Sequence, residues 1–188
     1  KMGYAIAEAF AIAGARVFLV SGPVDLHAPA QGVDLINVTS AGEMYDACKR
    51  LIDRIDVAIF NAAVSDFTPE EVSPKKVKRG TEDWNIKLKP TRDIAAEMGK
   101  TKKDGQLFIG FALETDNELE HARSKLDKKN LDLIVLNSLK EEGAGFGTDT
   151  NRVTMIGRSG TIDEYELKPK IQVAEDLVNR VVKMIDHA

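Results

Sequence analysis

The sequence is poor in the residues that carry redox and metal chemistry. Its 188 residues include one cysteine, Cys48, and three histidines. A single cysteine forms no disulfide within the chain and is typical of a reducing cytosol, so we expect a cytoplasmic protein. The apolar side of a helical pattern places Cys48 in the core. The histidines are scattered without the short spacing of metal ligands, so we expect no metal site built by the protein alone.

Long apolar runs are also missing. The longest span roughly five to nine residues, far below the roughly 20 that a membrane helix needs, so we expect no membrane partner. Apolar residues make up 43% and charged residues 30%, a composition typical of a globular protein and not of a disordered one. The length predicts one domain over residues 1–188.

A strong excess of positive charge is absent as well. The chain carries 26 basic and 30 acidic residues, a net charge of −4, which argues against a nucleic-acid partner. The basic residues nevertheless gather in two places, and such clusters in an acidic protein favour a small anionic ligand. The clusters are Lys75, Lys76, Lys78 and Arg79, and Lys125, Lys128 and Lys129.

Three common nucleotide signatures are missing. No Gly-x-Gly-x-x-Gly follows a predicted strand, and the glycine-rich stretch 143–147 lacks the Gly-Lys-Ser/Thr ending of a P-loop. The Asn61-Ala62-Ala63 turn is similar to the Asn-Asn-Ala-Gly turn of short-chain dehydrogenases. Tyr45 and Lys49 have the Tyr-x-x-x-Lys spacing of that family, but they precede the turn instead of following it. A nicotinamide site is therefore weakly supported.

The periodicity of apolar residues predicts alternating helices and strands. This alternation indicates an α/β fold, a Rossmann-like three-layer sandwich with a mostly parallel sheet, a C-terminal β-hairpin and an irregular flap at about 65–83. Ser40 and Glu43 form a predicted capping box. Predicted helices span 2–15, 40–54, 91–99, 117–129 and 171–185; predicted strands span 16–21, 33–38, 56–60, 84–89, 107–113, 131–136, 152–156 and 161–167.

Ligands of such sheets bind beyond the carboxyl ends of the strands, which selects residues 61–66, 111–115 and 137 onward. The small side chains of Asn61 to Ser65 would let a ligand lie against the backbone. Asp66 could orient a ribose hydroxyl or hold Mg²⁺ through water. The alternative is a tight turn whose alanines only pack against a helix.

Other candidates have equally plain structural alternatives. Lys76 and its basic neighbours could close over phosphates and stabilise charge at phosphorus, or they could belong to a solvated linker. Lys125 and Lys129 have i, i+4 spacing on one helix face and would bind an anion or be ordinary surface charge. Phe111 could stack on a base or fill the core.

The combination of motifs is more specific than any one of them. It resembles phosphopantothenoylcysteine synthetase, the second half of the bacterial bifunctional coenzyme A biosynthesis protein, over nearly the whole chain. The blocks that carry the resemblance, in order, are Lys1 to Ala7, Val20 to Val24, Asn61 to Phe67, Lys76 to Arg79, Gly110 to Thr115, Lys129 to Asp132 and Phe146 to Asn151.

The resemblance implies a ligase that joins 4′-phosphopantothenate to L-cysteine. CTP with Mg²⁺ would activate the acid as an acyl-cytidylate, and cysteine would displace CMP. FMN would enter only through a decarboxylase half. Carried over by position, Lys76 is the catalytic candidate, Ala63 a substrate contact, and the nucleotide contacts are Phe60, Asn61, Ala62, Asp66, Lys76, Arg92, Asp93, Ile94, Ala95, Phe111, Lys125 and Lys129.

The sequence departs from the family pattern in three places. Lys89 to Ile94 carries its proline two positions early, which makes the contacts of Arg92 less secure than those of Asp93. Arg79 replaces a lysine, which keeps the charge and changes the donor geometry. The family's first strand and glycine-rich turn, which carry an asparagine for the acyl-cytidylate, are absent before Lys1, so we expect the natural N-terminus upstream.

The resemblance also implies a homodimer in which residues 65–83 reach across to the neighbouring subunit. Two alternatives stay open at this stage. A nicotinamide-dependent reductase would share the sheet and the Asn-Ala-Ala turn. A non-catalytic association module would share the basic flap and the apolar last helix.

Overall fold

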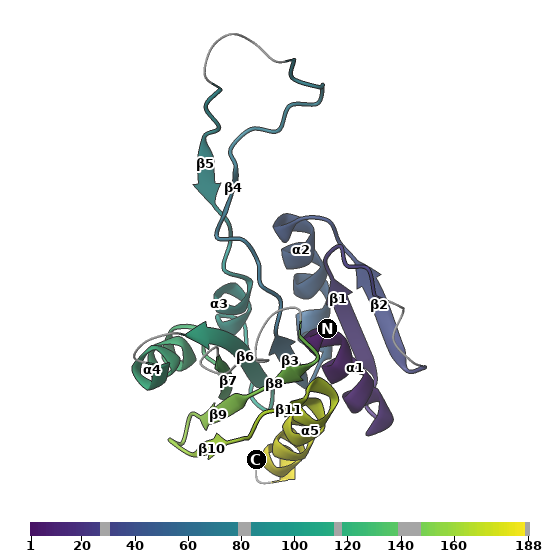
Figure 1. The fold of residues 1–188 in the computed structure, drawn as a ribbon, viewed down its shortest axis with the longest axis vertical. Helices are drawn as coiled ribbons and strands as arrows, with labels where there is room; N and C mark the ends of the chain where they lie inside the picture. The colour runs from purple at the N-terminus through teal and green to yellow at the C-terminus, as the bar shows by residue number, and fades with distance from the viewer. Residues whose placement is uncertain (27–30, 79–83, 115–117, 139–147, 187–188) are drawn as a thin grey trace.

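A five-stranded sheet forms the centre of the computed structural model, which describes residues 1–26, 31–78, 84–114, 118–138 and 148–186 (Figure 1). The strand order is β10-β9-β7-β6-β3. Strands β3 (Val57–Phe60), β6 (Leu107–Glu114) and β7 (Leu133–Ser138) are parallel, whereas β9 (Val153–Gly157) runs antiparallel to β7 and forms a hairpin with β10 (Ile162–Glu164). The predicted sheet and its C-terminal hairpin are confirmed.

Helices cover both faces of this sheet, which gives the predicted three layers. Helices α1 (Met2–Ile12) and α5 (Lys170–Asp186) pack against each other and against one face. Helices α2 (Ala41–Leu51), α3 (Ile94–Gly99) and α4 (Glu118–Lys128) cover the other face. No helix in the described ranges is long and apolar enough to cross a membrane.

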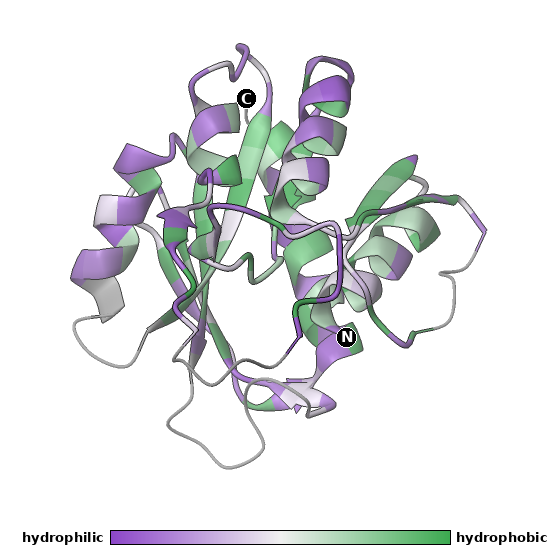
Figure 2. Ribbon diagram, turned by 90° about the horizontal axis from the view of Figure 1, so that it is seen from above, coloured by the Kyte–Doolittle hydropathy of each residue, from purple (hydrophilic) through white to green (hydrophobic). Residues whose placement is uncertain are grey.

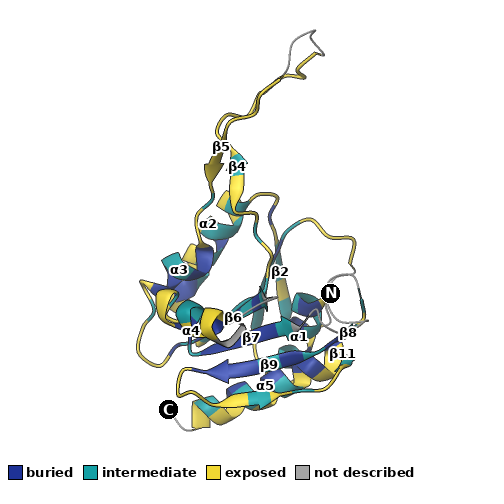
Figure 3. Ribbon diagram, turned by 60° about the vertical axis from the view of Figure 1, so that its left-hand side comes forward, coloured by how far each residue is buried: buried dark blue, intermediate teal, exposed yellow. Residues whose placement is uncertain are grey.

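Strand β7 shows why its sequence becomes the middle of the core. Leu133 and Val135 belong to the core under α1 and α5, whereas Ile134 and Leu136 belong to the core under α3 and α4. Successive strand residues point to opposite faces, so a strand covered on both sides must be apolar throughout. Figure 2 shows that the central strands are hydrophobic, and Figure 3 shows that they are buried between helices whose outer faces are more exposed.

Strands β1 (Val17–Ser21) and β2 (Val33–Asn37) form a separate two-stranded parallel sheet beside α1. In the described part of the chain, β1 pairs only with β2, and β3 pairs only with β6. A small antiparallel pair, β8 (Thr150–Asn151) with β11 (Lys168–Pro169), leads into α5. The short 3-10 helix η1 (Ile52–Arg54) follows α2.

The capping box predicted for α2 is confirmed. The Glu43 N–H donates to Oγ of Ser40 at 3.2 Å, and the Glu43 carboxylate accepts the Thr39 N–H at 2.7 Å. The bonds that the Glu43 carboxylate accepts from the N–H and the hydroxyl of Thr39 hold the pKa of Glu43 below its usual range. Helix α1 ends at Ile12, before the predicted Ala15, because Gly14 turns the chain with a φ of 92°.

A long arm leaves the body between β3 and α3 (Figures 1 and 3). At its base, β4 (Phe67–Pro69) pairs antiparallel with β5 (Leu88–Pro90). The predicted strand over 84–89 is wrong in extent, because only Leu88 and Lys89 of that range are in a strand and Trp84 is 70% exposed. Alternating apolar residues need a surface to cover, and the described part of this chain offers the arm none.

Candidate functional site

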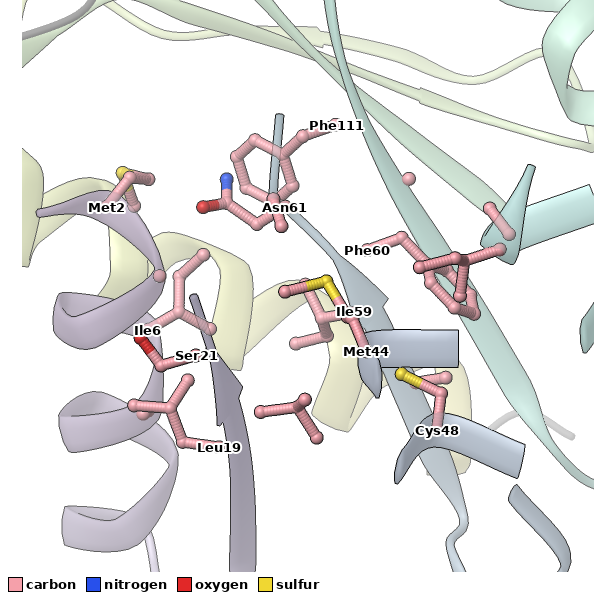
Figure 4. Close-up of a pocket in the computed structure, with 18 of the residues that line it drawn as sticks. Met2, Ile6, Leu19, Ser21, Met44, Cys48, Ile59, Phe60, Asn61 and Phe111 are labelled. Atoms are coloured by element: carbon pink, nitrogen blue, oxygen red, sulfur yellow. The ribbon is translucent and has the colours of Figure 1, made fainter. Parts of the chain in front are cut away.

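A cleft of about 1560 Å³ begins at the carboxyl edge of the sheet and continues between β1 and β3 (Figure 4). Figure 4 shows Ile6 and Leu19 on one side of its inner part and Ile59, Met44 and Cys48 on the other. Cys48 is half-buried against the core, and burial raises the pKa of its thiol. We call this inner part the groove. It is apolar, whereas the carboxyl edge carries the polar side chains.

Eleven of the twelve residues predicted to contact a nucleotide line this cleft, and so does Ala63. They are Phe60, Asn61, Ala62, Asp66, Arg92, Asp93, Ile94, Ala95, Phe111, Lys125 and Lys129. They come from the end of β3, the interior of β6, the base of the arm, the start of α3 and the end of α4. Residues that lie up to 69 positions apart in the chain therefore line one cleft, which begins at the edge that the strand rule selects. Their contact with a nucleotide stays a prediction.

Lys76 is the exception. It lies on the exposed arm and does not line the cleft. Lys75 and Lys78 are exposed on the same arm, and Arg79 lies outside the described residues. A single chain therefore does not bring the predicted catalytic lysine to the predicted nucleotide residues. The glycine-rich stretch 143–147 and Thr115 also lie outside the described residues.

The Asn61 side chain lies close to the first turn of α1. A Cβ built on Gly3 would lie 3.2 Å from Oδ1 of Asn61. After Asn61 the chain is held by short-range bonds: the Val64 N–H donates to the Ala62 carbonyl, and the Thr91 hydroxyl donates to the Ser65 carbonyl. The Thr91 N–H donates to the Asp66 carbonyl at 2.9 Å, which joins Asp66 to the segment that carries Arg92 and Asp93.

Asp93 and Lys129 connect α3 with the end of α4. Oδ1 of Asp93 accepts the Ala96 N–H at 3.0 Å and caps α3, while Oδ2 lies 2.9 Å from the Lys129 ammonium. Partial burial acts to raise the pKa of Asp93, but the bonds from Lys129 and the Ala96 N–H outweigh it and lower the pKa below its ordinary value. The pair fixes the position of the Lys129 ammonium at the cleft, with the Asp93 carboxylate as its counter-charge.

The position of Lys129 depends on a close backbone contact. A Cβ at Gly99 would lie 2.2 Å from the Lys129 carbonyl oxygen, so this approach requires glycine. The next residue, Asn130, has a φ of 52°, and its side-chain N–H donates to the Gly99 carbonyl at 3.0 Å. Arg158 donates from Nε to the Leu131 carbonyl at 2.9 Å and closes the turn from the hairpin side.

Arg92 and Phe111 form the remaining walls. The Arg92 guanidinium lies 4.8 Å from the centre of the Tyr45 ring, a cation–π contact that ties the start of α3 to α2. Phe111 lies within β6, half-buried against the core under α1 and α5, and lines the cleft. Phe111 therefore packs against the core and also borders the cleft, and its stacking on a base stays a prediction.

Several polar residues at the cleft were not among the predicted contacts, and three of them, Asn137, Asn151 and Lys170, lie near the ends of β7 and β8 and at the start of α5. Asn137 follows the strand rule, because it comes near the end of β7. Asn151 ends the block from Phe146 that carries part of the resemblance but was assigned no contact, and Lys170 lies on an element whose sequence gives no motif for binding. Within the described ranges, no three His, Cys, Asp or Glu side chains gather as a metal site.

Comparisons with known proteins point in one direction. Residues 1–185 match the family described as "DNA/pantothenate metabolism flavoprotein C-terminal domain". The crystal structure of the C-terminal domain of "Coenzyme A biosynthesis bifunctional protein CoaBC" superimposes with a TM-score of 0.83 at 38% identity, covering 100% of this chain and 83% of that one.

Two curated relatives match over nearly the whole chain. "Cysteine/Cysteine sulfinic acid decarboxylase" from an unknown prokaryotic organism is 52% identical over 98% of this chain and 52% of that protein. "Coenzyme A biosynthesis bifunctional protein CoaBC" of Bacillus subtilis (strain 168) is 44% identical over 98% of this chain and 45% of that protein. The chain spans about half the length of these relatives.

Proposed function

The chain belongs to the family of the DNA/pantothenate metabolism flavoprotein C-terminal domain, and on that premise we propose that it joins 4′-phosphopantothenate to L-cysteine with CTP. The observation that carries the proposal is the convergence of eleven predicted nucleotide residues on one cleft at the carboxyl edge of the sheet. The relatives named for coenzyme A biosynthesis and the superposition on the C-terminal domain of one of them support it.

The reaction would proceed in two steps. A carboxylate oxygen of the acid attacks the α-phosphorus of CTP, and the bond to pyrophosphate breaks with its electron pair on the leaving group. The cysteine amine then attacks the acyl carbon. The carbon–nitrogen bond forms, the carbon–oxygen bond to the phosphate breaks, CMP leaves, and the amine proton passes to solvent. A carboxylate needs this activation because its oxygen alone is a poor leaving group.

The charges at the cleft suit the first step. Lys125 and Lys129 line it from the end of α4, and the Lys129 ammonium is already fixed by Asp93. Preorganised positive charge stabilises the charge that develops on the phosphates without further reorganisation. Arg92 is held by the Tyr45 ring and adds a third positive group. Phe111 offers a ring face for the base.

Mg²⁺ fits this site as a companion of the triphosphate. The described residues contain no group of three metal ligands, and Mg²⁺ bound to nucleotides is held largely by phosphate oxygens and water. Asp66 lines the cleft and would contact the ion through water. When bound, the ion would neutralise phosphate charge. FMN would belong to a decarboxylase half, and these residues are not proposed to hold it.

Lys76 would reach a cleft from a second copy of the chain. Its arm extends away from the body (Figure 3) and carries exposed apolar side chains, including Val72 at 83% and Trp84 at 70% exposed. Such side chains on an extended arm suit burial against another subunit. We therefore propose a homodimer in which each arm carries Lys76 to the partner's cleft.

The groove would take one more extended strand. Strands β1 and β3 line it, and neither pairs with another strand on that side in the described part of the chain. Parallel edges with apolar side chains such as Leu19 and Ile59 suit a single apolar strand parallel to both. We propose that the family's first strand occupies this groove and that its glycine-rich turn completes the phosphate side of the cleft.

The relative named as a decarboxylase supports a second candidate, an activity on cysteine that releases CO₂.

One experiment separates the two candidates. It incubates the protein with CTP, 4′-phosphopantothenate and L-cysteine, and measures pyrophosphate, the coupled product and CO₂. Pyrophosphate that requires the acid, with product that requires cysteine, supports the ligase. CO₂ from cysteine without CTP supports the decarboxylase. A thermal-shift series with CTP, ATP and NADPH tests base choice and the reductase alternative; stabilisation by NADPH alone would overturn the proposal.

A further inference from the structure

A second polar cluster lines the same cleft where β7, β8 and α5 meet. It consists of Asn137, Asn151 and Lys170. Asn151 is 2% exposed and Lys170 is 7% exposed, so both are buried polar groups on a cleft wall. None of the three belongs to the predicted nucleotide contacts, which gather on the α3 and α4 side.

Asn151 has a hydrogen-bond acceptor without a partner. Its side-chain N–H donates to Oδ1 of Asn137 at 2.7 Å, whereas its own Oδ1 is buried and accepts no hydrogen bond from any described residue. Strand β8 holds Asn151 in register opposite Lys168 of β11, so its backbone is fixed. Buried polar atoms are nearly always paired. Because Asn151 also lines the cleft, a ligand bound there can supply the donor that this oxygen lacks.

Lys170 brings a sheltered positive charge to the same wall. Its ammonium donates to the Thr148 carbonyl and lies 3.4 Å from the Thr148 hydroxyl, while its N–H donates to the Asp149 carbonyl at 2.9 Å. Burial is the main cause that lowers the pKa of Lys170; Lys1 lowers it further and Asp149 opposes the shift. A partly desolvated cation favours an anionic neighbour. The lining of the cleft thus includes both an acceptor and a positive charge.

We propose that Asn137, Asn151 and Lys170 form the subsite for the amino-acid substrate. The Asn151 oxygen accepts from the amino group, Asn137 completes the polar wall, and the Lys170 ammonium faces the carboxylate. The proposal rests on the proposed function, in which L-cysteine is one of three substrates. Of these three, L-cysteine is the one that carries an amine donor and a carboxylate on a single carbon.

Direct binding tests this assignment independently of catalysis. Calorimetric titration under reducing conditions compares L-cysteine with cysteamine, which lacks the carboxylate, and 3-mercaptopropionate, which lacks the amine. We expect each analogue to bind about tenfold more weakly than L-cysteine. Lys170→Met should remove the preference for L-cysteine over cysteamine. Asn151→Leu should remove the preference over 3-mercaptopropionate.

Matched controls lie on α5, where Lys183 and Asn179 are exposed. Lys183→Met and Asn179→Leu should leave both preferences unchanged. If Asn151→Leu fails to fold, Asn137→Ala at the half-exposed partner replaces it and should weaken L-cysteine binding to a similar degree. Thermal unfolding and CTP titration report whether each variant keeps its structure.

Two results would overturn the subsite. One is the absence of saturable L-cysteine binding at millimolar concentration. The other is a set of folded variants that bind L-cysteine normally and lose affinity for CTP or pyrophosphate, which would assign the cluster to phosphates. Failure of the proposed function is a separate result, because it would appear as no pyrophosphate release from CTP and 4′-phosphopantothenate while L-cysteine still binds.

Discussion

The Lys129 ammonium lies 2.9 Å from Oδ2 of Asp93, the residue whose other carboxylate oxygen caps α3. One carboxylate thus serves two elements that are 36 positions apart in the chain. It caps the N-terminus of α3 by accepting a backbone N–H, and it fixes the position of the Lys129 ammonium at the cleft. Changes at this pair should therefore affect both stability and the binding of an anionic ligand.

Asp93→Asn should destabilise the fold in a pH-dependent way. The pKa of Asp93 in the fold lies below its ordinary value of 3.8, so its contribution is fully present above that value and is lost as the pH falls through the folded pKa. We expect a loss of up to about 1 kcal/mol near neutral pH, the upper range for an exposed ion pair, that shrinks as the pH falls below 3.8. Urea unfolding of both proteins from pH 7 to pH 2.5 measures it. A difference that is independent of pH would contradict the ionised pair.

Gly99→Ala should displace the Lys129 turn. The new Cβ would meet the Lys129 carbonyl at 2.2 Å, and backbone cannot move aside without cost. We expect a loss of at least about 2 kcal/mol in unfolding free energy together with weaker CTP binding. Gly42→Ala is the matched control, because its Cβ would lie 3.8 Å from the Ser40 hydroxyl within α2; it should stabilise by about 0.5–1 kcal/mol. Equal effects of the two changes would contradict the close contact.

Breaking the Lys102–Asp132 pair should be strongly destabilising. The Lys102 ammonium lies 2.6 Å from Asp132, whose Oδ2 also accepts the Phe108 N–H at 2.6 Å, and the two side chains are only 11% and 20% exposed. Removing one partner leaves a mostly buried charge, at a cost of about 3 kcal/mol. Denaturant unfolding of Lys102→Met tests this. Arg16→Met, at the exposed pair with Asp34, should change stability by less than about 0.5 kcal/mol.

Lys76→Ala should slow acyl-cytidylate formation and change the free energy of unfolding by less than about 0.5 kcal/mol, because the residue is exposed on the arm. Single-turnover pyrophosphate release measures the first effect.

Mixing the Lys76→Ala variant with a Lys129→Met variant tests the exchange of arms, because one cleft of a mixed dimer would then contain both native lysines. Recovery of activity on mixing is expected. Unchanged single-turnover rates for Lys76→Ala would remove its catalytic assignment.

Filling the groove should stabilise the protein. An apolar extended segment of about six residues, joined ahead of Lys1 through glycines, would pair with β1 and β3. We expect a higher Tm and tighter CTP binding, because two strand edges gain hydrogen bonds and the groove loses water. A segment of equal length with alternating aspartates is the control. Equal Tm values for both segments would argue against strand insertion.

Much of the fold follows from local sequence pattern. The uninterrupted apolar run in β7 predicts a strand covered on both faces, and the Ser40–Glu43 spacing predicts the start of α2. The positions after the strands also follow, because parallel strands end at one edge. These features depend on neighbours within a few residues, so periodicity and spacing contain them.

Other features needed the tertiary structure. The alternation from Trp84 to Lys89 predicts a longer strand than β5, because the sequence does not say whether any surface is available to cover it. The separation of Lys76 from its own cleft depends on the direction in which the arm leaves the body. The orphaned oxygen of Asn151 exists only because β8, β11 and α5 bury it.

By itself the sequence determined the α/β order, the edge of the sheet at which we predict ligand binding, and the residue types at that edge, since local burial and strand direction decide these. The tertiary structure decided which of those residues share one cleft, that the groove between β1 and β3 is open on both strand edges in the described chain, and that Lys170 is a buried cation. Contacts between distant segments set these features, and no local pattern records them.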